Sequence, residues 1–222
     1  MIPYMPSCKT KLSKLNDEML VSFMKHPFLK EMALGTLSHE SFECYLVQDE
    51  MYLDLYAGYL RNISLRLSDS IEKAFVRSFA ERGVEAERTL HAHLMRLLDG
   101  RQKHLPLCDE LCSYDKFIRL YINRESVAFA FAAVLPCTWL YNLVGQSLLR
   151  VSALNGNFYR EWIMAYSDEQ YDADVNCFVD IALRYIESDD IDSCVDIYRR
   201  SAIHDLSLFD YAYKNNKKNE NT

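Results

Sequence analysis

The sequence predicts a single all-α domain, a bundle of helices joined by short connections. Half of its 222 residues are hydrophobic, but only six are glycine and five are proline, and so few breakers favour long helices. Apolar residues recur at helical spacing, whereas no stretch of useful length alternates apolar and polar residues as a strand does. A chain of this length fills one core. We therefore expect the domain to cover residues 1–213, followed by a disordered tail at 214–222 that contains no apolar residue.

Charge and cysteine usage narrow the class of protein. A net charge of -7 and a pI near 5.4 weigh against a nucleic-acid or acidic-membrane partner. The apolar run Val127–Pro136 is too short to span a bilayer, and residues 1–14 lack the basic start and apolar stretch of a secretory signal. Seven irregularly spaced cysteines fit free thiols in a reducing compartment. These features predict a cytoplasmic protein.

The N-terminal half contains four predicted helices whose ends are marked by breakers and caps. The first ends before Pro27, because the residue before a proline avoids the helical region. Gly35 is a natural stop for the short second helix, and Ser38 is suited to cap the third. The fourth is more charged and is expected to face solvent, with Gly83 tolerated inside it. The predicted ranges are 10–25, 28–34, 39 to about 67, and 69–98.

The C-terminal half contains five predicted helices. A loop from Asp99 to Pro106 precedes them, and Ser188–Asp190 is a polar break before the last one. The Asn155-Gly156-Asn157 sequence is typical of a turn. The predicted ranges are 113–123, 127–149, 159–166, 169–187 and 192–213.

The run Leu135–Gly145 combines a proline inside a helix with two chemically active side chains. Pro136 removes one backbone donor and clashes with the carbonyl of Ala132, so we expect a kink. Cys137 follows the kink and shares a helix face with Tyr141, four residues later. A thiol beside a phenol is suited to catalysis, but a buried cysteine is also commonly a small core residue. The residues by themselves leave both interpretations open.

The third predicted helix carries an aspartate among aromatic side chains. Asp49 shares a face with Tyr45 and Tyr52, at spacings of four and three residues. Because an unpaired buried carboxylate is costly, Asp49 is expected to have a partner. It is either a site residue or a partly exposed aspartate that binds a tyrosine hydroxyl.

No metal site, phosphate-binding loop or serine-hydrolase motif is predicted. Cys108 and Cys112 can share a helix face, but no second cysteine or histidine pair completes a zinc set. His91 and His93 are two residues apart and cannot face one way on a helix. The chain also lacks a G-x-G-x-x-G sequence, a Walker loop and a G-x-S-x-G elbow.

Five motifs, taken in order and with their spacing, resemble those of the TenA/thiaminase II family. They cover the chain from residue 26 to residue 213, and the cysteine-bearing motif is the most specific. The motifs are His26-Pro27-Phe28, Gln48-Asp49-x-x-Tyr52, Leu135-Pro136-Cys137-x-Trp139-x-Tyr141-x-x-x-Gly145, Tyr159-x-x-Trp162-Ile163-x-x-Tyr166 and Leu208-Phe209-Asp210-Tyr211-Ala212-Tyr213.

The resemblance implies a haem-oxygenase-like helical bundle without haem, usually assembled as a homotetramer. It also implies an aminopyrimidine aminohydrolase (thiaminase II). Such an enzyme hydrolyses 4-amino-5-aminomethyl-2-methylpyrimidine, and in many members thiamine, to the hydroxymethyl pyrimidine used in thiamine salvage. No metal or organic cofactor is implied, and the partner is a small aminopyrimidine.

By position in these motifs, Cys137 corresponds to the family nucleophile and Asp49 to the aspartate that binds the aminopyrimidine edge. A thiolate is a strong nucleophile near neutral pH, as addition to an electron-poor pyrimidine requires. A carboxylate at that edge can also help to protonate the ring. The family places pocket tyrosines, which stack on the ring and donate hydrogen bonds, at Tyr52, Tyr114, Tyr141 and Tyr166.

The chain departs from the family pattern near its end. Members with the cysteine generally have a catalytic glutamate shortly before a final Phe-Trp pair, but here the two positions hold Asp205 and Phe209. Aspartate withdraws the carboxyl group by a little over 1 Å, roughly one C–C bond, and such a misplacement costs on the order of 100-fold in rate. A bridging water, a backbone shift or His204 are the candidate compensations.

The sequence is compatible with two other functions. Binding can survive a weakened acid/base group, so Asp205 also suits a non-catalytic pyrimidine- or thiamine-binding protein or a regulatory protein on the same scaffold. A third possibility is an enzyme of the same fold that acts on a related heterocyclic amine.

Overall fold

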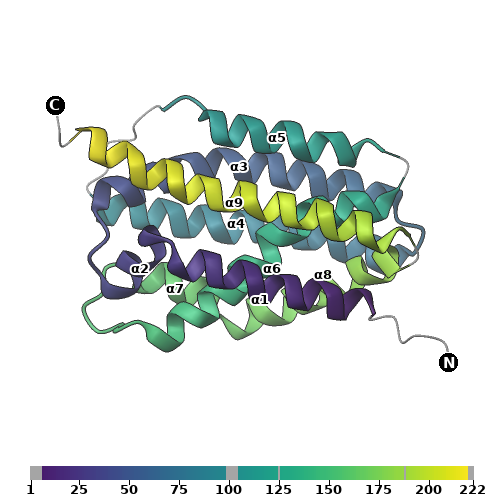
Figure 1. Ribbon diagram of the computed structural model, residues 1–222, viewed down its shortest axis with the longest axis horizontal. Helices are drawn as coiled ribbons and strands as arrows, with labels where there is room; N and C mark the ends of the chain where they lie inside the picture. Colours follow the sequence, from purple (N-terminus) through teal and green to yellow (C-terminus); the bar gives the residue numbers. More distant parts are fainter. Residues whose placement is uncertain (1–6, 99–104, 125, 188, 220–222) are drawn as a thin grey trace.

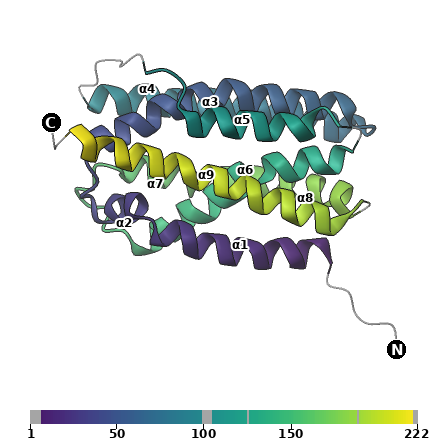
Figure 2. The ribbon, with the colours of Figure 1, turned by 45° about the horizontal axis from the view of Figure 1, so that its top comes forward.

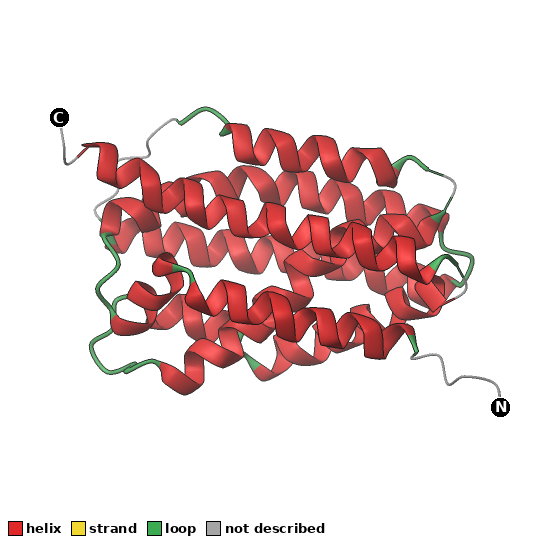
Figure 3. Cartoon of the chain, in the orientation of Figure 1, coloured by secondary structure: helices red, strands yellow, loops and turns green. Residues whose placement is uncertain are grey.

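The computed structural model describes residues 7–98, 105–124, 126–187 and 189–219, the last five for their backbone alone. Within these ranges all regular secondary structure is helical (Figure 3), which confirms the predicted all-α fold. The helices are α1 (Cys8–Lys25), α2 (Pro27–Leu34), α3 (His39–Arg66), α4 (Ser70–Leu97), α5 (Asp109–Ile122), α6 (Val127–Val151), α7 (Arg160–Tyr166), α8 (Glu169–Glu187) and α9 (Ile191–Asn219).

Two helices differ from their predicted bounds by more than two residues. Helix α5 begins four residues early because the Cys108 sulfur accepts the N–H of Leu111 at 3.4 Å and caps the helix. Helix α9 continues through Asn219, so the first six residues of the expected tail are helical. Residues 220–222, most of the predicted 99–106 loop and Ser188 lie outside the described residues.

The helices pack in layers (Figure 2), with α3, α4 and α5 on one side, α6 to α9 in the middle, and α1 and α2 on the other side. Helix α9 runs along the bundle between α5 and α1 (Figure 1). Helix α6 lies at the centre, and its residues Ala130–Leu135 are fully buried. A side chain on α6 therefore contacts groups from several other helices at once.

Helix α6 extends well beyond the apolar run Val127–Pro136 and ends at Val151, two residues past its predicted end. Its 25 residues are long and apolar enough to cross a membrane, which corrects the expectation that this region is too short. In the bundle, however, 72% of its most apolar window is buried by the other helices, as in the core helix of a folded domain.

Pro136 lies inside α6, and Figure 1 shows this helix changing direction in its middle. The carbonyl groups near the kink find side-chain partners. Ser201 Oγ donates to the carbonyl of Ala133 at 2.6 Å, and Tyr56 Oη lies 3.5 Å from the carbonyl of Val134. The kink is thus stabilised by polar groups from α9 and α3.

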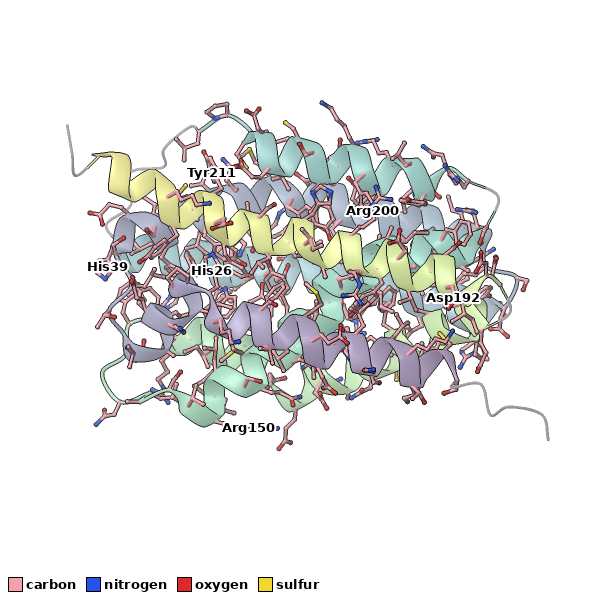
Figure 4. The ribbon with its side chains drawn as sticks, viewed as in Figure 1. His26, His39, Arg150, Asp192, Arg200 and Tyr211 are labelled. Atoms are coloured by element: carbon pink, nitrogen blue, oxygen red, sulfur yellow. The ribbon has the colours of Figure 1, made fainter. Side chains whose placement is uncertain are left out.

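The first and last family-like motifs meet in space. His26, labelled in Figure 4 where α1 meets α2, accepts the N–H of Phe28 through Nδ1 at 3.2 Å, and its Nε2 faces Asp210 Oδ1 at 3.3 Å. The ring of Phe209 packs against Phe28, with centroids 5.0 Å apart, and stacks on Tyr45 at 5.3 Å. These residues connect the junction of α1 and α2 to the C-terminal part of α9.

Candidate active site

A buried cavity between α3, α4, α6, α7 and α8 contains most of the predicted site. Its lining includes five predicted site residues, namely Asp49, Tyr52, Cys137, Tyr141 and Tyr166. The volume of about 40 Å³ holds roughly three water molecules at about 10–15 Å³ each.

Cys137 reaches the cavity from α6, one residue after the kink proline. Burial raises the pKa of its thiol well above the ordinary value, and the carboxyl groups of Asp205, Glu87 and Asp49 raise it further. The hydroxyl of Tyr52 acts in the opposite direction as a hydrogen-bond donor. Without a ligand, Cys137 is therefore a thiol, and an attack by its sulfur must be coupled to loss of the proton.

Asp49 is buried on α3 and has two partners. Tyr45 Oη donates to Asp49 Oδ2 at 2.9 Å, and His91 Nε2 of α4 lies 3.4 Å from the same oxygen. The other ring nitrogen of His91, Nδ1, lies 3.1 Å from Glu50 Oε2, which links the buried pair to the surface. The aspartate is thus held in place by a tyrosine and a histidine, as its burial requires.

His91 is a charged group that the sequence interpretation missed. Burial disfavours its imidazolium form, but the carboxylates of Asp49 and Glu50 outweigh this and raise its pKa to about 10. Arg88 Nε also donates to Glu50 Oε1, at 3.0 Å. In the sequence, the spacing of His91 from His93 bears only on a metal site, which it does not favour. Nothing in the sequence around Asp49 and Glu50 points to His91, because these groups meet only when α3 packs against α4.

Glu87 is the second site residue that was missed. It lines the cavity one helical turn before His91, and Tyr166 Oη donates to its Oε1 at 3.0 Å. Burial, reinforced by Asp49, raises the pKa of Glu87 to about 7, although His91 and Tyr166 act to lower it. Its four-residue spacing from His91 was visible in the sequence and places both on one face of α4.

The two remaining predicted residues, Tyr114 and Asp205, do not line the cavity. Tyr114 of α5 stacks on Tyr52, with ring centroids 5.4 Å apart. Its hydroxyl lies 2.9 Å from Ser201 Oγ, which itself donates to the carbonyl of Ala133. Tyr114 therefore supports a cavity tyrosine from behind.

Asp205 is 3% exposed on α9, and its Oδ2 has no hydrogen-bond partner among the described residues. Burial raises its pKa well above the ordinary aspartate value; Asp49 adds to this effect, and the Tyr114 hydroxyl opposes it. The carboxyl group of Asp205 therefore holds a proton more tightly than an exposed aspartate does. His204 stacks on Tyr114, with centroids 5.3 Å apart, and does not line the cavity either.

Gly145 allows α6 and α7 to approach closely at the site. A Cβ atom at this position would lie 2.5 Å from the carbonyl carbon and oxygen of Tyr166. The ring of Tyr166 then lies against Tyr141, with centroids 5.5 Å apart. The glycine that ends the cysteine-bearing motif thus positions a tyrosine of the site.

The described part of the chain contains no cluster of metal-ligating side chains. No three histidine, cysteine or carboxylate side chains in it converge as a metal site would require. Cys108, one of the two cysteines considered for zinc, caps α5.

Comparison with known proteins identifies the family. Residues 11–215 match the sequence model of the TENA/THI-4/PQQC family. Over 201 residues, 86% of this chain and 91% of the relative, it is 28% identical to a Helicobacter pylori protein named aminopyrimidine aminohydrolase. It is 29% identical over 164 residues to a Bacillus subtilis protein of the same name, covering 71% and 69% of the two chains.

A solved structure shows the same fold. The TenA homologue protein from P. horikoshii OT3 superposes with a TM-score of 0.82 at 22% identity, over 94% of this chain and 99% of the other. Since the match to the family covers nearly the whole chain, the protein belongs to the TENA/THI-4/PQQC family.

Proposed function

We propose that this protein is an aminopyrimidine aminohydrolase, a hydrolase that acts on a C–N bond in thiamine salvage. The observation that carries the proposal is the cavity in which Cys137 of α6, Asp49 of α3 and three tyrosines face one another. Two relatives that match most of the chain carry this name. The substrate we propose is 4-amino-5-aminomethyl-2-methylpyrimidine, with thiamine as a second substrate.

Asp49 is the proposed anchor for the aminopyrimidine. Such an edge presents N–H donors and ring-nitrogen acceptors, and a carboxyl group can pair with both when it shares a proton. The contacts of Asp49 with Tyr45 and His91 restrict its orientation. Tyr52, Tyr141 and Tyr166 supply aromatic surface for the ring.

Cys137 is the proposed nucleophile. Its sulfur adds to an electron-poor ring carbon, and the thiol proton passes to a carboxylate of the site. The electron pair of the adduct expels the amine from the exocyclic methylene and breaks the C–N bond. Water then adds its oxygen to the methylene, the C–S bond breaks, and the ring is restored. One water is consumed, and one ammonia, or the free thiazole when thiamine is the substrate, is released.

Asp205 is the proposed general acid at the position of the family glutamate. Burial raises the pKa of its carboxyl group, as suits a proton donor. Since it does not line the cavity, it acts only after the site rearranges or through a bridging water. The position of Asp205 outside the cavity also favours the second candidate function, a non-catalytic pyrimidine or thiamine binder. The homotetramer and the cytoplasmic location stay predictions.

Turnover assays test the proposal. Purified protein is incubated with 4-amino-5-aminomethyl-2-methylpyrimidine or with thiamine, and release of the hydroxymethyl pyrimidine is followed by chromatography. We expect turnover, and a loss on the order of 10³-fold or more in Cys137→Ser because the nucleophile is removed. Cys177→Ser, at an exposed cysteine, is the matched control and should retain activity.

The outcomes separate the alternatives. Binding without turnover in the natural protein would establish the binder. Turnover that persists in Cys137→Ser would refute the nucleophile, and activity only on another amine would indicate a different substrate.

A further inference from the structure

A second hollow lies directly outside the site cavity, over α4, α7 and the start of α8. We call it the outer groove; its walls include Ala86 and Leu90 of α4 and Met164 and Ala165 of α7, and its volume is about 620 Å³. The outer groove and the cavity share five lining residues, which are Phe79, Gly83, Glu87, Tyr166 and Tyr171. These shared residues form a junction between the two spaces.

Gly83 makes the junction wide. A Cβ atom added to Gly83 would meet nothing within 4 Å, so the helix faces open space at this point. Glycine inside a helix costs about 1 kcal/mol relative to alanine. At this position it leaves open a space that a side chain would narrow. The same helix face carries Glu87, one turn further on, at the same junction.

The outer groove combines apolar walls with negative charge. Its lining includes four acidic residues, Glu87, Glu161, Asp168 and Asp174, and a single basic one, Arg82. Arg82 is paired with Asp174, at 3.2 Å, and Glu161 with His93, at 2.7 Å.

Two of the acidic residues have no basic partner in the groove. Asp168 accepts backbone N–H groups at the start of α8. Glu87 accepts the neutral hydroxyl of Tyr166, and because its pKa is about 7, a nearby cation favours its ionised form. A flat apolar group with a positive charge complements this lining.

We propose that the outer groove is the subsite for the positively charged substituent that leaves the pyrimidine, with Glu87 at the junction as its counter-ion. The inference rests on the proposed function, which places the pyrimidine ring in the inner cavity. A thiazolium ring would fill the outer groove, whereas the ammonium group of an aminomethyl pyrimidine would reach only Glu87. When the C–N bond breaks, the leaving group becomes neutral, so its attraction to Glu87 ends and its release is favoured.

Filling the outer groove tests the subsite. Met164 is 44% exposed, so Met164→Trp is compatible with folding, and Leu120→Trp on α5, at a residue 56% exposed, is the matched control. In Met164→Trp we expect the ratio of kcat/KM for thiamine to that for the aminomethyl pyrimidine to fall about tenfold. In the control this ratio should stay unchanged. An unchanged ratio in Met164→Trp would overturn the proposal.

Equilibrium binding provides a readout that does not need turnover, so failure of the proposed hydrolysis stays distinguishable. By titration calorimetry in the Cys137→Ser background, where the proposed turnover is lost, adding Met164→Trp should weaken thiamine binding but not binding of the hydroxymethyl pyrimidine. Glu87→Gln should weaken binding of both cationic ligands more than that of the uncharged hydroxymethyl pyrimidine. Equal losses for charged and uncharged ligands would overturn the role of Glu87.

The junction is tested by adding side chains at Gly83. Gly83→Leu should narrow the passage and slow both thiamine and aminomethyl pyrimidine turnover, or their association rates if there is no turnover. Gly83→Ala is the control for helix effects and should be more stable with little change in rate. If Gly83→Leu folds and both rates are unchanged, ligands do not pass this junction.

Discussion

Replacing Asp205 with glutamate tests whether a short carboxyl group limits catalysis. The aspartate is 3% exposed, does not line the cavity, and has an Oδ2 atom without a partner among the described residues. Glutamate extends the carboxyl group by roughly one C–C bond, about 1.5 Å. A displacement of about 1 Å is worth on the order of 100-fold in rate, so Asp205→Glu should raise kcat by up to about that factor.

The same change has an independent effect on stability. An added methylene in a well-packed core costs about 1–3 kcal/mol, so Asp205→Glu should unfold at a lower urea concentration even as kcat rises. Asp205→Asn keeps the size and removes the proton; its kcat should fall below that of the natural protein, whereas its stability should be equal or higher because a buried carboxyl group is lost.

The assay is the initial rate of hydroxymethyl pyrimidine formation at saturating 4-amino-5-aminomethyl-2-methylpyrimidine, beside urea unfolding of each variant. The reasoning is refuted if folded Asp205→Glu is no faster than the natural protein while Asp205→Asn retains full activity. That pair of results would show that Asp205 takes no part in the reaction.

Two further predictions concern the packing and the charge around the site. Gly145→Ala should lower the free energy of unfolding by at least about 1–3 kcal/mol and reduce activity, because its Cβ would lie 2.5 Å from the Tyr166 backbone. Gly58→Ala, whose Cβ meets nothing within 4 Å, should gain up to about 1 kcal/mol, and equal effects of the two changes in urea unfolding would contradict the close approach. The pKa of His91 is raised from 6.5 to about 10 in the folded protein, so its stabilisation is fully present below pH 6.5 and is lost as the pH rises through about 10. The natural protein should therefore lose more stability between pH 6 and pH 10 than His91→Gln, and identical pH dependences in urea unfolding would show that His91 is not charged in the folded state.

Much of the secondary structure was predictable because its signals are local. Pro27, Gly35 and Ser38 mark helix ends through backbone sterics and capping, which act within one helical turn, and the structure places helix ends there. The apolar content of α6 predicted that it is buried. That its carbonyl groups near the kink accept hydrogen bonds from Ser201 and Tyr56 was not predictable, since both donors come from distant parts of the chain.

The sequence by itself determined the all-α class, most helix ends and the motif residues Cys137 and Asp49, because helical spacing, breakers and motif order are properties of neighbouring residues. Only the tertiary structure decided which of these residues share a cavity, that Asp205 stands back from it, and that His91 and Glu87 belong to the site. The physical reason is that burial and charge pairing depend on how helices pack. The proximity of α3 to α4 raises the pKa of His91, and the burial of Asp205 on α9 raises the pKa of its carboxyl group.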